Sequence, residues 1–180
     1  QAGEWNEAAG SHKLREPNDV LVDRNGNVFI SQGHTPGAGG DPRVFKFDGK
    51  GNFVKTWGGK GVDPGKFDVA HGMALDAKGQ LWVTDRENQR IQIFDADGGL
   101  VKVLKFAGLP CDLEIGPQYI YMVNGFAGQL LRLDLDGKVL AVYETKVQWS
   151  NWSKRVVTLT QIFALASPRR RRAERSRRAR

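Results

Sequence analysis

The segment HGMALDAKGQLWVTDRENQRIQIFDADG, residues 71–98, decides the fold of this chain. It contains short runs rich in Val, Ile, Leu, Phe and Trp, each as long as a strand and too short for a helix. Between the runs lie the pairs Lys78-Gly79 and Asp97-Gly98, and glycines in such pairs supply the positive φ that tight hairpins require. The segment therefore predicts consecutive antiparallel strands joined by tight turns.

The same pattern occurs before and after this segment. The first copy reads PNDVLVDRNGNVFIS from Pro17 and RVFKFDGKGNFVKTWG from Arg43, and the third reads PCDLEIGPQYIYMVN from Pro110 and QLLRLDLDGKVLAVY from Gln129. Each copy holds four strand-length runs in roughly 40–50 residues, the size of a propeller blade. A flat β-solenoid and a sandwich are the alternatives, but a sandwich gives no reason for repetition. We therefore expect an all-β chain, a partial β-propeller of four-stranded antiparallel blades.

Three parts are expected along the chain. Residues 1–13 form a lead-in, blades occupy about 14–58, 67–106 and 109–143, and residues 144–180 form an atypical basic tail. Propellers have about 4–8 blades, because a closed ring protects the strand edges. We therefore expect further blades in the parent protein.

The net charge of +7 comes from the tail. Residues 1–144 carry 16 Lys and Arg against 19 Asp and Glu, whereas residues 145–180 carry 11 against 1. Such a tail is expected to be disordered or frame-shifted and to bind anionic polymers only weakly. The acidic body disfavours nucleic acid as a partner. No apolar run approaches the length of a membrane span, and the single cysteine excludes an intramolecular disulfide.

The second copy resembles NHL repeats, through HGMALDAKG followed by N-x-R-I-Q-x-F-D-x-x-G. Its HGMAL and DREN-x-RIQ-x-F segments are similar to the lyase half of peptide-amidating enzymes, and the resemblance covers about residues 14–143. It implies a six-bladed, secreted or periplasmic propeller that cleaves a peptidyl hydroxyglycine into a peptide amide and glyoxylate. It also implies a zinc ion held by histidines from several blades, a structural calcium ion in the channel, and Arg and Tyr side chains at the reaction centre.

The resemblance assigns His71 to the zinc site. Asn18 and Cys111 are its equivalents in the other copies, and all three precede the first strand of a blade, at one rim of the channel. His34, in the SQGH loop, is expected near the same rim as a second zinc ligand. The other interpretations are a channel-lining polar residue for His71 and a solvated loop residue for His34.

Other site residues are implied in the same way. Arg43 aligns with an arginine before the third strand and would bind a substrate carboxylate, although a salt bridge between blades is the alternative. The calcium ion is implied at the backbone carbonyls of Val20 and Met73, since hard cations favour oxygen ligands. Cys111 is expected to be a buried structural thiol rather than a nucleophile.

Two functions therefore compete. The first is a zinc-dependent carbon–nitrogen lyase acting on a peptide or small molecule in the channel. The second is a non-catalytic scaffold that binds a protein or carbohydrate ligand. RNA binding, a third option, is disfavoured by the acidic body.

Overall fold

The structure, a computed structural model, describes residues 14–144, and within that range it consists of three four-stranded antiparallel sheets without an α-helix. The first blade holds β1 (Pro17–Val22), β2 (Val28–Gln32), β3 (Arg43–Phe47) and β4 (Phe53–Gly58), with a 3-10 turn at Gly37–Gly39. The second holds β5 (Ala70–Leu75), β6 (Leu81–Asp85), β7 (Arg90–Phe94) and β8 (Leu100–Lys105). The third holds β9 (Pro110–Ile115), β10 (Ile120–Asn124), β11 (Gln129–Leu133) and β12 (Val139–Glu144).

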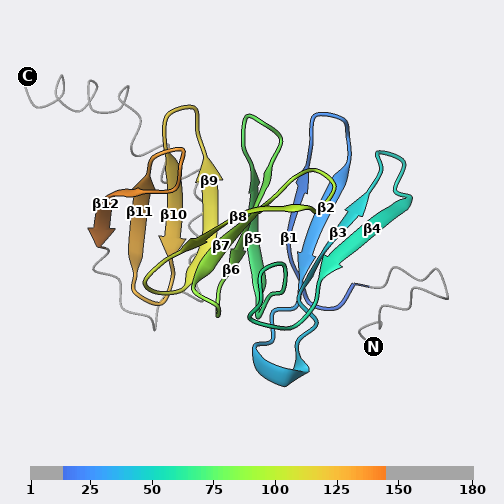
Figure 1. The fold of residues 1–180 in the computed structure, drawn as a ribbon, viewed down its shortest axis with the longest axis horizontal. Helices are drawn as coiled ribbons and strands as arrows, with labels where there is room; N and C mark the ends of the chain where they lie inside the picture. The colour runs from blue at the N-terminus through green and yellow to red at the C-terminus, as the bar shows by residue number, and fades with distance from the viewer. Residues whose placement is uncertain (1–13, 145–180) are drawn as a thin grey trace, which may run out of the picture. The chain divides into compact units, whose positions relative to one another are not determined.

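Each sheet is a meander in which neighbouring strands follow one another along the chain. Figure 1 shows the three sheets side by side in chain order, with β1 and β9 as the strands of the outer sheets closest to the middle one. The prediction of an all-β chain built of four-stranded antiparallel blades is confirmed. The predictions for residues 1–13 and for the basic tail from residue 145 onward lie outside the described residues.

Most of the hairpin turns are built by the repeated D-x-x-G motif. In the β5–β6 turn, Asp76 Oδ1 accepts hydrogen bonds from the backbone N–H groups of Lys78 and Gln80, both at 2.9 Å. Gly79 adopts a φ of +76°, a conformation that side chains disfavour. In DGKG of the β3–β4 turn the positive φ of +84° falls on Gly51, at the equivalent position. The aspartate of the motif thus holds the backbone of the turn, and its glycine provides the positive φ with which the chain reverses.

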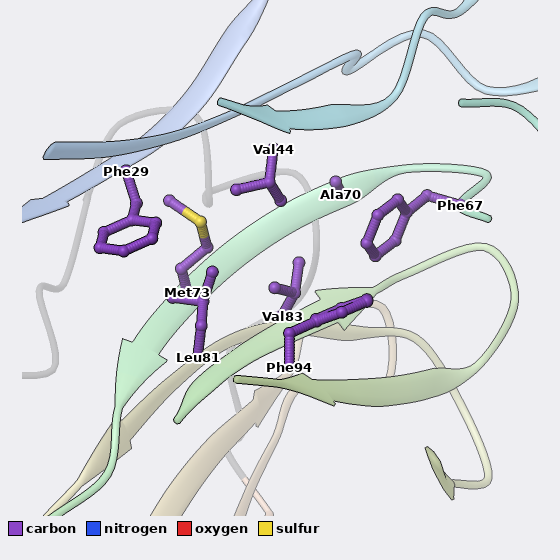
Figure 2. Packing of buried hydrophobic residues seen from close by; sticks show 8 residues of the cluster. All are labelled: Phe29, Val44, Phe67, Ala70, Met73, Leu81, Val83 and Phe94. Atoms are coloured by element: carbon purple, nitrogen blue, oxygen red, sulfur yellow. The ribbon is translucent and has the colours of Figure 1, made fainter. Parts of the chain in front are cut away.

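The first hydrophobic core lies between blades one and two. Figure 2 shows Phe29 and Val44 of the first blade facing Met73, Val83 and Phe94 of the second, and all five are buried. Successive side chains of a strand point to opposite faces, so one face of the middle sheet packs on the first blade and the other on the third. Aromatic side chains also pack across this junction, where Trp57 lies against Phe94 with ring centroids 5.9 Å apart.

The second core joins blades two and three. It contains Trp82 and Ile93 from the second blade and Leu113, Ile120 and Met122 from the third. Both junctions therefore use the same faces of consecutive sheets, as expected of repeated blades.

A lysine also connects each blade to a turn of the next. Lys55 Nζ donates to the carbonyl of Asp97, and Lys102 Nζ donates to the carbonyl of Asp136 at 3.2 Å. The two lysines occupy the same position in β4 and β8, and the two carbonyls occupy the same position in the third turn of the following blade. The repeat thus extends to contacts between blades, which no local sequence pattern indicates. The described residues include no helix long and apolar enough to cross a membrane.

Candidate functional site

The candidate site lies at the rim where the inner strands β1, β5 and β9 begin. Asn18, His71 and Cys111 are the second residues of these strands. The strand pairing brings the ends of β2, β6 and β10 to the same rim, because the first residue of each inner strand pairs with the last residue of the next strand. Loops that follow β2, β6 and β10 therefore deliver His34, Arg86 and Phe126 to the rim.

The structure brings the two predicted zinc ligands together. The rings of His34 and His71 lie with centroids 5.2 Å apart and planes inclined at 49°. His34 comes from the loop after β2 of the first blade and His71 from β5 of the second. The pair thus bridges two neighbouring blades, an arrangement that the sequence spacing alone did not establish.

The tautomer of His71 is fixed by the third blade. Its Nδ1 lies 2.8 Å from the carbonyl oxygen of Cys111, and a carbonyl only accepts, so Nδ1 carries the proton and Nε2 is the basic nitrogen. Burial first, and then the positive charge of Arg86, lower the pKa of His71 to about 4, although the hydrogen bond to Cys111 opposes this. His71 is therefore neutral at pH 7, the state in which imidazole binds metals.

His34 is oriented in a similar way. The Asn18 amide nitrogen donates to the carbonyl of Ala70 at 2.7 Å, which leaves Asn18 Oδ1 as an acceptor. His34 Nδ1 lies 2.9 Å from that oxygen and donates to it. Each imidazole thus has its Nδ1 proton held by a fixed acceptor, an arrangement typical of histidines that bind metals through Nε2.

Arg86 is a site residue that the sequence reasoning missed. It follows β6, is only 7% exposed and pairs through Nε with Glu87 Oε1 at 2.9 Å. Its guanidinium lies 5.8 Å from the ring centroid of Phe126. The equivalent positions of the other blades hold Gly33 and Gly125. The charged residue at this position of the middle copy alone could therefore have identified Arg86 from the sequence.

Arg43 lies elsewhere on this rim. It is the first residue of β3, pairs with Gln32 of β2, and donates through Nε to Asp41 Oδ1 at 2.7 Å. Its ion-pair partner therefore belongs to its own blade rather than to the histidine pair. The assignment of Arg43 to substrate binding stays a prediction, and the contact seen is a structural ion pair.

The DREN-x-RIQ segment builds a buried polar network. Asp85 Oδ2 accepts hydrogen bonds from Arg90 Nε at 2.7 Å, from Asn88 Nδ2 at 2.9 Å and from Gln92 Nε2 at 3.1 Å. Arg90 also donates to the carbonyls of residues 62, 63 and 66 in the Gly-rich connection between the blades. Burial raises the pKa of Asp85, while these donors oppose the rise. Most of the signature is therefore structural, and Arg86 is its member at the rim.

The predicted calcium positions lie beside two carboxylates on the inner strands β1 and β9. Asp19 accepts hydrogen bonds at 2.8 Å from the backbone N–H groups of Val20, in its own strand, and Met73, in the next blade. Asp112 occupies the equivalent position of β9. Burial, with a contribution from the negative charge of Asp19, raises the pKa of Asp112 to about 6, against the hydrogen bond from Leu113.

Glycine separates these carboxylates in the middle blade. A Cβ atom on Gly72 would lie 2.7 Å from Asp112 Oδ1 and 2.8 Å from the carbonyl oxygen of Cys111. Only glycine lets β9 approach β5 this closely. Cys111 itself contacts the carbonyl of Leu109 at 3.5 Å, and burial raises the pKa of its thiol. A protonated thiol is a poor nucleophile, which agrees with a structural role.

Residues 67–94 match the NHL repeat family. The chain is 36% identical over 85 residues to human NHL repeat-containing protein 3, covering 46% of this chain and 23% of that protein. It is 35% identical over 120 residues to the mouse peptidyl-glycine alpha-amidating monooxygenase, covering 61% of this chain and 12% of the relative. It is 36% identical over 84 residues to a probable peptidyl-alpha-hydroxyglycine alpha-amidating lyase of Caenorhabditis elegans, covering 45% and 23%.

Solved structures support the fold. A chain of a nidogen/laminin complex matches with a TM-score of 0.60 and 17% identity, over 74% of this chain and 49% of its own length. Virginiamycin B lyase from Staphylococcus aureus matches with a TM-score of 0.55 and 18% identity, over 74% and 42%. The chain spans about a quarter or less of the curated relatives named above. It carries an NHL repeat, folds as part of a β-propeller, and is related to the NHL-repeat and peptide-amidating proteins.

Proposed function

We propose that this rim is part of the reaction centre of a propeller lyase that cleaves a peptidyl-α-hydroxyglycine or a similar small α-hydroxy substrate. The observation that carries the proposal is the His34–His71 pair, in which both Nδ1 atoms are held by fixed acceptors. The proposal is also supported by the names of two relatives, a peptide-amidating monooxygenase and a probable amidating lyase, whose matches cover 61% and 45% of this chain.

The histidine pair fits zinc. Each ring has Nε2 available, and His71 is neutral at pH 7. A catalytic zinc ion usually has three protein ligands, and residues 14–144 contain no group of three or more His, Cys, Asp or Glu side chains placed to hold a metal ion. The pair therefore supplies two ligands. When bound, zinc would supply Lewis-acid chemistry that makes a hydroxyl group more acidic.

Arg86 suits the carboxylate of the proposed substrate. Its guanidinium is largely buried at the rim and close enough to His71 to lower the pKa of that residue. A guanidinium binds a carboxylate by parallel hydrogen bonds and fixes its orientation. In the proposed reaction the substrate hydroxyl loses its proton, its carbon–oxygen bond becomes a carbonyl, and the carbon–nitrogen bond breaks. The amide nitrogen takes up a proton, which yields a peptide amide and glyoxylate.

The carboxylates beside Val20 and Met73 suit calcium. β1 and β5 are edge strands of their sheets, so they leave backbone carbonyls without a sheet partner. Asp19 and Asp112 add oxygen ligands of the kind that calcium prefers. We assign this ion a structural role between the inner strands. A secreted or periplasmic location is proposed on the relationship to the amidating enzymes alone.

Zinc binding tests the proposal with a matched control. His71→Asn removes Nε2 yet retains an amide donor of the kind that Asn18 uses to reach Ala70. We expect His71→Asn and His34→Ala each to weaken zinc binding by about ten-fold or more, measured by competition with a chromophoric chelator. His12→Ala, which changes a histidine outside residues 14–144, serves as the control and is expected to bind zinc like the native chain.

Activity is measured as glyoxylate release from N-benzoyl-α-hydroxyglycine. We expect Arg86→Lys to raise KM more than it lowers kcat, because lysine keeps the charge and loses the bidentate geometry. Zinc binding that is unchanged in both rim-histidine variants would refute the metal site. If neither zinc binding nor glyoxylate release is observed, the alternative function is favoured, a non-catalytic scaffold that binds a protein or carbohydrate ligand.

A further inference from the structure

A cavity of about 520 Å³ lies at the opposite rim from the histidine pair. Its walls come from the ends of β5 and β9 and from the turns that follow them, whereas His71 lies near the beginning of β5. The volume falls within the range of roughly 300–1,000 Å³ that small-molecule sites occupy. The cavity is therefore separate from the proposed reaction centre.

The interior of the cavity is apolar and contains an oriented indole. Trp82 is 4% exposed, and its Nε1 donates to Asp76 Oδ2 at 3.2 Å. Leu75 and Ile115, the last residues of β5 and β9, line the walls, and Leu135 lies at the mouth with 49% of its surface exposed. Because Asp76 also holds the turn, the indole is fixed before any ligand arrives. The edge of this indole, together with Leu75 and Ile115, gives the cavity an apolar wall against which an aromatic side chain can pack.

The mouth carries unpaired charges of both signs. Arg24 comes from the first blade and Lys78 from the second, and neither side chain forms a hydrogen bond or ion pair with another residue in 14–144. Asp136, from the third blade, adds a carboxylate, and its backbone carbonyl is held by Lys102 at 3.2 Å. The carboxylate of Asp76 is engaged by three donors within its own hairpin. The mouth therefore offers cations from blades one and two and a free anion from blade three.

We propose that this cavity binds a free aromatic amino acid. The ring would pack against Trp82 and Leu75, the carboxylate would meet Arg24 and Lys78, and the ammonium group would meet Asp136. A zwitterion satisfies both signs of charge at once, whereas a simple carboxylate or amine leaves one of them without a partner. This binding does not depend on zinc or on the lyase reaction.

The test is an NMR titration of the full chain with L-phenylalanine, followed on the Trp82 Nε1–H signal. For a ligand of this size we expect a Kd of about 1 mM. Two analogues separate the charges: 3-phenylpropionate lacks the ammonium group, and phenylalaninamide lacks the carboxylate. Each is expected to bind at least about five-fold more weakly than phenylalanine.

Variants then assign each charge. Arg24→Gln is expected to weaken the binding of phenylalanine at least about five-fold and to leave the binding of phenylalaninamide unchanged. Asp136→Asn should weaken the binding of phenylalanine and leave the binding of 3-phenylpropionate unchanged. Lys50→Gln is the control, because Lys50 occupies in the β3–β4 turn the position that Lys78 holds in the β5–β6 turn. His71→Asn should not alter this titration. Lack of a saturable shift, or equal binding of all three ligands, would overturn the proposal.

Discussion

In calcium-free buffer, replacing Asp112 with Asn should make the protein more stable at neutral pH. Burial raises the pKa of this carboxyl group from 3.8 to about 6, with a further contribution from Asp19. A raised pKa means that the folded state holds the proton more tightly than the unfolded state. The free energy of unfolding therefore falls as the pH rises from about 4 to about 6, and the loss is complete above that window.

The magnitude follows from the size of the shift. Each pKa unit corresponds to about 1.4 kcal/mol, so the rise to about 6 costs the folded state on the order of 3 kcal/mol at pH 7. Asparagine carries no charge at any pH, and its amide oxygen can still accept the hydrogen bond that Leu113 N–H donates at 2.8 Å. Asp112→Asn should therefore match the native chain below pH 4 and exceed its stability at pH 7.

Urea unfolding followed by tryptophan fluorescence, at pH steps between 3.5 and 7.5, measures this difference. Burial raises the pKa values of Asp19 and Asp85 as well, so the native curve alone does not isolate Asp112. The difference between variant and native does. Asp136→Asn, which removes a carboxylate from an exposed turn, is the control and should change the free energy of unfolding by less than about 0.5 kcal/mol at pH 7. A variant that is equally or less stable than the native chain at pH 7 would refute the reasoning.

Three further substitutions test the contacts that hold the blades, each by urea unfolding at pH 7. Asp85→Ala leaves the guanidinium of Arg90 buried without its carboxylate and should lower the free energy of unfolding by about 3–5 kcal/mol; a loss below 1 kcal/mol would contradict a buried pair. Thr84→Val keeps the shape of the side chain but removes the hydroxyl group that accepts a hydrogen bond from Gly72 N–H at 2.7 Å. It should lower the free energy of unfolding by about 1–3 kcal/mol. An unchanged urea midpoint would show that Gly72 N–H finds another acceptor. Gly72→Ala places a methyl group against Asp112, whereas the methyl group of Gly79→Ala meets no atom within 4 Å and is disfavoured only by the φ of +76°. Gly72→Ala should therefore lower the free energy of unfolding more than Gly79→Ala. The reverse order would contradict the close approach of β9 to β5.

The sequence predicted the features that are local or periodic. Strand-length apolar runs and the D-x-x-G turns identified the meanders, because a turn such as Asp76 to Gly79 is held by atoms within five residues. The equivalence of Asn18, His71 and Cys111 also followed from the repeat, since each is the second residue of an inner strand.

The sequence did not predict contacts that depend on the angle between blades. The sequence predicted His34 and His71 at one rim, but not the ring contact between them, which depends on how the loop after β2 turns toward the next blade. Arg86 was hidden within a signature whose other members, such as Asp85 and Arg90, form a structural network. The role of Arg43 in substrate binding stays a prediction, and the contact seen in the structure is an ion pair with Asp41 of its own blade. In a repeat protein most residues have equivalents in the other copies. A candidate functional residue is therefore best recognised where one copy carries a different residue type, as at Arg86.

His71 takes part in a contact between blades that the first blade makes with a different side chain. In the first blade, Asn18 uses its side chain to bind a carbonyl at the start of the next inner strand, that of Ala70. His71 binds the Cys111 carbonyl of the following blade in the same way, so the link between blades is conserved in kind. Imidazole, unlike the amide, has a second nitrogen on the far side of the ring. The blade contact therefore holds Nδ1 and leaves Nε2 as the nitrogen that would bind zinc in the proposed site.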